Sequence, residues 1–179
     1  MEYYVVSPSE EKKAVQYLFD NFTDRMWEKI DIEMMYPFHF PEFFEEFSHE
    51  MNIGSLLRKG GFNWEPEMMN AVCGELVEKT AKKKQAQERK KAVQYLIDNI
   101  PKETWEEVVK QLKEMGTEWY IFQHHDFGMG VRNLLREGGF DWGPIEMDEC
   151  WVELVKRAIR RKFGKIDFPK SREIDNSFE

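Results

Sequence analysis

Apolar residues recur every three or four positions along most of the chain, which is the spacing of an amphipathic helix. The first such segment carries Ala14, Tyr17, Leu18 and Phe22. The Gly60-Gly61 and Gly138-Gly139 pairs, and prolines such as Pro66, Pro101 and Pro144, stand at the boundaries of such segments. The pattern therefore predicts an all-α protein.

The same pattern occurs twice, at an offset of 78 residues, and the two copies align without a gap. The stretch KKAVQYL at 12–18 returns at 90–96, and LLRKGGFNW at 56–64 returns as LLREGGFDW at 134–142. A unit of this length with only two copies differs from the short, many-fold repeats of solenoid proteins. The sequence predicts a tandem duplication of a unit of about 78 residues and roughly four helices.

This repeat also predicts the domain organisation. We expect helical repeat unit 1 at residues 1–81, helical repeat unit 2 at 82–163 and a polar C-terminal tail at 164–179. The segment at about 78–92 contains neither glycine nor proline and is rich in strong helix formers. It is expected to form one long helix that joins the two units.

In each unit the third helix is expected to be continuous. It should run from Pro41 to the Gly60-Gly61 pair in unit 1, and from Thr117 to the Gly138-Gly139 pair in unit 2. Glycine suits the left-handed conformation that ends many helices. The aromatic residues after each glycine pair are expected to pack against the core, because aromatic side chains contribute large buried areas.

The two copies differ most in the chemistry of this third helix. Unit 2 places five polar residues there: His124, His125, Asp126, Arg132 and Asn133. On a continuous helix His125 and Arg132, seven residues apart, share one face, and His125 takes the place of the apolar Phe47. We expect both to face the interior beside a carboxylate, since an unpaired buried charge is costly. The acidic residues close in sequence are Glu118, Asp126, Glu146 and Glu149.

Three interpretations of this cluster stay open. The first is an interior polar network, and the second is an anion or small-ligand pocket anchored on Arg132, which includes an enzymatic pocket. The third is a metal site built from His124, His125, Asp126 and Cys150. Adjacent histidines on a helix point about 100° apart, which disfavours a shared metal ion. We assign no metal and no cofactor. No nucleophile elbow, phosphate loop or zinc-binding helix motif is present, so no catalytic residue is assigned.

The motif H-H-x-x-G-M-x-x-R-N, which spans His124 to Asn133, resembles the core of an uncharacterised bacterial family of all-helical domains. The resemblance covers residues 117–159, in the second copy only. It implies a helix with this motif, followed by a loop and a final helix. It implies no reaction.

Composition narrows the class of protein. The net charge is −8, and the apolar and aromatic fractions are those of a globular chain. No apolar run approaches the length of a membrane span, and the N-terminus lacks the features of a signal peptide. We expect a cytoplasmic protein with no membrane association. The two cysteines, Cys73 and Cys150, are expected to be free thiols.

Two basic clusters stand out against this acidic background, at 79–91 and 156–165. Candidate contacts with nucleic acid or with a partner are Lys82, Lys83, Lys84, Lys90, Arg160 and Arg161. Such clusters are typical of phosphate contacts, but also of a solvated helix surface whose last turn favours cations.

The first functional hypothesis is a non-enzymatic module that binds another macromolecule, such as a bacterial or phage regulatory or inhibitory protein, with a protein as its partner. The second is a small-ligand or anion pocket at His125 and Arg132. The third is nucleic-acid binding through the lysine-rich helix. The acidic surface outside the two basic clusters favours the first hypothesis, because it suits a partner with a basic surface.

Overall fold

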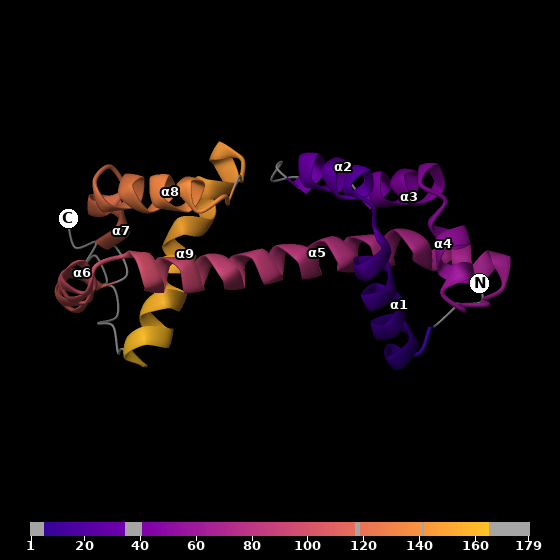
Figure 1. Cartoon of the computed structure of the whole chain (residues 1–179), viewed down its shortest axis with the longest axis horizontal. Helices are drawn as coiled ribbons and strands as arrows, with labels where there is room; N and C mark the ends of the chain where they lie inside the picture. The colour runs from indigo at the N-terminus through magenta and orange to yellow at the C-terminus, as the bar shows by residue number, and fades with distance from the viewer. Residues whose placement is uncertain (1–5, 35–40, 117–118, 141, 165–179) are drawn as a thin grey trace, which may run out of the picture. The chain divides into compact units, whose positions relative to one another are not determined.

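The computed structural model describes residues 6–34, 41–116, 119–140 and 142–164. Within these ranges the chain forms nine helices and no strand (Figure 1), which confirms the predicted all-α class. No helix in them is long and apolar enough to cross a membrane. The predicted polar tail lies, except for its first residue, outside the described ranges.

The helices divide between two compact units, unit 1 at Met1–Gln87 and unit 2 at Glu88–Glu179. Unit 1 contains α1 (Pro8–Asn21), α2 (Asp24–Met34), α3 (Pro41–Glu50), α4 (Ile53–Lys59) and the first part of α5 (Pro66–Asn99). Unit 2 contains the last part of α5, then α6 (Lys102–Met115), α7 (Trp119–Gln123), α8 (Phe127–Glu137) and α9 (Pro144–Phe163). The boundary between residues 81 and 82 that the repeat suggests stays a prediction.

Helix α5 confirms the long helix expected across residues 78–92. It runs without interruption for 34 residues. From Glu75 to Asn99 it contains no glycine or proline, so the helical hydrogen bonds continue through this stretch. It ends just before Pro101, because proline disfavours the helical conformation of the residue that precedes it.

The predicted third helix of unit 1 is broken. Helix α3 ends at Glu50 and α4 begins at Ile53, so the expectation of one helix from Pro41 to the Gly60-Gly61 pair is wrong. The break lies at Asn52, which adopts a left-handed conformation with φ 51°. Asparagine tolerates this conformation better than most residues, because its short polar side chain can bond locally.

The third helix of unit 2 is broken as well. Helix α7 ends at Gln123, residues 124–126 form a turn, and α8 begins at Phe127. The prediction of one helix from Thr117 to the Gly138-Gly139 pair is therefore wrong. Histidine and aspartate rank low in helix propensity, so the run of three such residues at the turn is a weak point in a helix.

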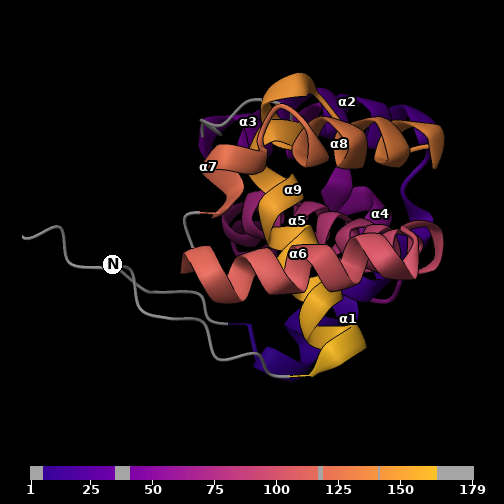
Figure 2. The ribbon, with the colours of Figure 1, turned by 90° about the vertical axis from the view of Figure 1, so that its left-hand side faces the viewer.

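Each unit has its own apolar core. In unit 1 it includes the fully buried Leu18, Leu57 and Leu76, and in unit 2 the fully buried Trp105, Trp119 and Trp151. Figure 2 views unit 2 with α6 in front of α9 and with α8 above them. Within this unit α9 packs against α8.

The loop after each glycine pair packs as the sequence suggests. The rings of Tyr17 and Phe62 lie 5.8 Å apart in unit 1, and those of Tyr95 and Phe140, each 78 residues later, lie 5.6 Å apart in unit 2. A Cβ atom on Gly138 would lie 2.6 Å from the Tyr95 ring. Close packing therefore favours glycine at this position. The loop contributes to the packing of its unit.

Candidate functional site

The turn between α7 and α8 removes His125 from the core. His125 and Asp126 are exposed and His124 is half-buried. The expectation that His125 faces inward is wrong, because it assumed an unbroken helix that would carry His125 to the face of Arg132. Its ring contacts that of His124, with ring centres 5.3 Å apart. A His125→Phe substitution would therefore expose an apolar ring rather than restore a core position.

Arg132 does face inward, and its side chain is only 11 % exposed. Its Nε lies 3.2 Å from Oδ1 of Asp148, and its Nη2 donates to the carbonyl oxygen of His124 at 3.3 Å. The guanidinium carbon stands 6.0 Å from the centre of the Trp151 ring. The partner carboxylate thus comes from α9, and it is none of the four acidic residues expected from proximity in sequence. One of these, Glu118, lies outside the described residues.

The burial of this ion pair is unequal, because the Asp148 side chain is 53 % exposed. Removing the arginine therefore leaves a hydrated carboxylate, whereas removing the aspartate leaves a guanidinium with few other partners. The Nη1 atom of Arg132 is already buried with no hydrogen-bond partner among the residues that the structure describes. The geometry supports a structural polar contact that joins α8, α9 and the α7–α8 turn.

This asymmetry gives a stability prediction. Arg132→Ala should lower the free energy of unfolding by about 1–2 kcal/mol, less than a fully buried pair would lose, because Asp148 stays solvated. Asp148→Ala should cost more than Arg132→Met, since methionine keeps the packing on Trp151 and carries no charge. Chemical denaturation of the three variants measures their free energies of unfolding. A larger loss of this free energy for Arg132→Met than for Asp148→Ala would contradict the prediction.

The two cysteines are free thiols, as predicted, and both are buried. Burial raises the pKa of the Cys150 thiol to about 12 and that of Cys73 to about 11, so both are protonated near neutral pH and poorly nucleophilic. Within the described residues, no three histidine, cysteine, aspartate or glutamate side chains converge in a metal-binding arrangement.

Three lysines of the first basic cluster, Lys82, Lys83 and Lys84, contact other side chains of unit 1. Lys84 Nζ lies 2.6 Å from a carboxylate oxygen of Asp31 and 4.9 Å from the centre of the Trp27 ring. Lys83 donates to the side-chain oxygen of Gln16, and Lys82 pairs with Glu78. The contacts of Lys83 and Lys84 hold α5 against α1 and α2. The partner of Lys83 is a neutral amide, and Lys90, the fourth lysine among the candidates, is exposed.

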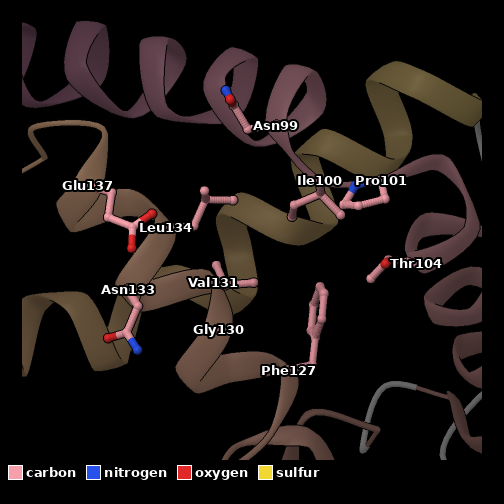
Figure 3. A pocket seen from close by; sticks show the side chains of 10 residues that line it. All are labelled: Asn99, Ile100, Pro101, Thr104, Phe127, Gly130, Val131, Asn133, Leu134 and Glu137. Carbon is pink, nitrogen blue, oxygen red and sulfur yellow. The ribbon is translucent and has the colours of Figure 1, made fainter.

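An open apolar groove of about 350 Å³ lies in unit 2, between α8 and the junction of α5 with α6. Figure 3 shows the side chains of Ile100, Val131 and Leu134 directed into one space, with Phe127 at one end. Polar side chains also line the groove: Asn99, Thr104, Asn133 and Glu137. Of the five polar candidates from the sequence, only Asn133 lines it.

Two residues that line the groove are smaller than those that stand 78 positions earlier in the chain. The positions of Ile100 and Thr104 carry Phe22 and Met26 in unit 1. Both of these larger side chains are buried there, and the Phe22 ring lies 5.0 Å from that of Trp27. Ile100 and Thr104 therefore fill less volume beside the groove than a phenylalanine and a methionine would.

Comparison with models of protein families, with curated proteins and with solved structures finds no match to this chain. The resemblance of residues 117–159 to a bacterial helical family therefore stays a prediction.

Proposed function

We propose that the protein is a non-enzymatic interaction module, and that the groove of unit 2 binds an amphipathic helix of a protein partner. The observation that carries the proposal is the groove itself, an open apolar surface with a polar rim. Binding an apolar face in such a groove removes apolar area from water, which favours association.

The groove is suited to several side chains of a partner rather than to one small molecule. It is open along its length, and its floor is formed by branched and aromatic side chains.

Charge favours a basic helix. Glu137 is the charged residue among those that line the groove, it is exposed, and it pairs with no residue that the structure describes. The chain as a whole carries a net charge of −8. A partner helix with lysine or arginine beside its apolar face would meet this rim with complementary charge.

We also propose that the two units descend from one duplicated sequence and now differ in role. The paired ring contacts at an offset of 78 residues support the common origin. Phe22 and Met26, the larger residues at the corresponding positions of unit 1, are buried, and we infer that unit 1 serves as scaffold. The double substitution Ile100→Phe and Thr104→Met should fill part of the groove of unit 2.

Gly130 offers a way to block the groove without disturbing the core. A Cβ atom built there meets no atom within 4 Å, so a side chain at this position extends freely over the groove. Gly130→Trp should weaken binding of a designed leucine–lysine amphipathic peptide by about tenfold or more, since it occupies the apolar surface. Isothermal titration calorimetry measures the effect, and Ala71→Trp, an exposed site on α5 in unit 1, is the matched control.

A leucine–glutamate peptide of the same pattern should bind much more weakly than the leucine–lysine peptide, because its acidic residues repel Glu137. Equal binding of the leucine–lysine peptide to wild type and to Gly130→Trp would overturn the proposal. An equal loss in Ala71→Trp would do so as well, because it would show that the loss does not come from filling the groove.

A further inference from the structure

The basic end of α9, defined as Arg160, Arg161 and Lys162, differs in its contacts from the equivalent lysines of unit 1. Those lysines are Lys82, Lys83 and Lys84, each 78 residues earlier. All three contact side chains of unit 1, as described above, and two of them meet a carboxylate. Their charge is thus largely matched inside the unit.

Two of the residues that these lysines contact are replaced in unit 2 by residues that cannot match a positive charge. The position of Asp31, which pairs with Lys84, carries Val109. The position of Phe19, whose ring centre lies 5.0 Å from Lys83 Nζ, carries Ile97. A valine cannot neutralise an ammonium group, and an isoleucine offers no ring face to a cation.

The cations of the basic end therefore face solvent. Arg160 and Arg161 are exposed, and neither forms an ion pair with any residue that the structure describes. Lys162 donates to the backbone carbonyl oxygen of Ile97 at 3.2 Å and pairs with no carboxylate among the described residues. The C-terminal end of the helix dipole favours cations here, but its partial negative charge is far smaller than three full charges.

An exposed aromatic ring adjoins these charges. Phe163 is the last residue of α9 and is 40 % exposed. Cationic side chains beside an exposed ring are the combination with which proteins bind single strands, where the cations contact phosphates and the ring stacks on a base. Arginine suits phosphate well, because its planar guanidinium donates two parallel hydrogen bonds.

We propose that the basic end of α9, together with Phe163, binds single-stranded nucleic acid through its phosphate backbone. The surface belongs to unit 2 and shares no residue with the groove. Its occupation does not depend on the partner helix proposed above, and the two proposals can fail separately. Sequence preference is not expected, because nothing at this surface is placed to read base edges.

Fluorescence anisotropy with a labelled oligothymidylate tests the proposal. Three phosphate contacts should make the affinity fall about 20-fold between about 50 and about 200 mM salt. The double substitution Arg160→Glu and Arg161→Glu should abolish binding at low salt, whereas Lys12→Glu with Lys13→Glu, an identical change of charge on α1, should leave it nearly intact. Phe163→Ala should weaken binding about fivefold or more and leave the salt dependence unchanged.

Circular dichroism confirms that each variant is folded before its binding is compared. Absence of saturable binding by the wild type at low salt would overturn the proposal, as would equal losses in the α9 and α1 variants. Binding of polyglutamate in place of the oligonucleotide would also overturn it, because the surface would then be a site for an acidic protein. The Gly130→Trp protein, with its groove blocked, should bind the oligonucleotide as the wild type does.

Discussion

Replacing Trp151 by alanine is expected to lower the free energy of unfolding by about 3–5 kcal/mol, the range for truncation of a large buried aromatic side chain. Trp151 is fully buried at the centre of unit 2. Its ring meets that of Trp119 edge to face at 6.0 Å and lies 6.5 Å from that of Phe127. Arg132 and His124 pack near the same ring. No single nearby side chain can fill the space that the indole leaves.

The equivalent position in unit 1 supplies the control. Cys73 stands there, and it is also buried. Cys73→Ala removes one sulfur atom and should cost far less, since the cavity is small. Chemical denaturation followed by circular dichroism measures both variants, and hydrogen exchange shows which unit is destabilised. A Trp151→Ala protein within about 1 kcal/mol of wild type would show that this ring does not organise the core.

His125 was misplaced because nothing in the apolar spacing marked the turn in which it lies. The two copies also differ in where their large buried side chains stand. In unit 1 Phe47 is buried, and the position of Trp151 holds the small Cys73. In unit 2 Trp151 on α9 is buried, and His125, at the position of Phe47, is exposed.

The architecture was predictable because it depends on strong and local signals. The spacing of apolar residues predicted the helices, and the absence of glycine and proline at 78–92 predicted the long α5. The turns that divide the third helix depend on a few residues of weak propensity, for which tertiary packing decides the outcome. A three-residue turn also changes which face each later side chain occupies. The inward position of Arg132 was therefore predicted correctly, but from a helix that does not exist.

The groove could not be predicted from one copy alone. Ile100 and Thr104 stand at the junction of two helices, and neither is a charged or metal-binding residue that would mark a site in the sequence. Its volume depends on what the neighbouring side chains leave unfilled, which is a property of packing. By contrast, the basic clusters were evident in the sequence, and the structure added which of their residues meet a carboxylate.

Two glycines of α8, separated by one residue, are expected to respond to alanine with opposite signs. Gly128 is buried, and a Cβ atom there would lie 2.8 Å from Cζ2 of Trp151 and 3.1 Å from the carbonyl oxygen of Gln123. The backbone oxygen cannot rotate away, and the indole is fixed by the surrounding core. The gain in helix propensity, about 1 kcal/mol at most, is smaller than the typical cost of overpacking, about 1–3 kcal/mol.

Gly128→Ala should therefore destabilise the protein by about 2 kcal/mol, whereas Gly130→Ala should stabilise it by about 0.5–1 kcal/mol. Gly130 is exposed, and its Cβ would meet no atom within 4 Å, so only the helix propensity changes. Neither glycine has a positive φ, and backbone strain is the same in both variants. Denaturant midpoints measured side by side test the pair. If both substitutions stabilise the protein, Trp151 does not pack on α8 as closely as the structure shows. The contact between α8 and α9 near Arg132 would then be looser as well.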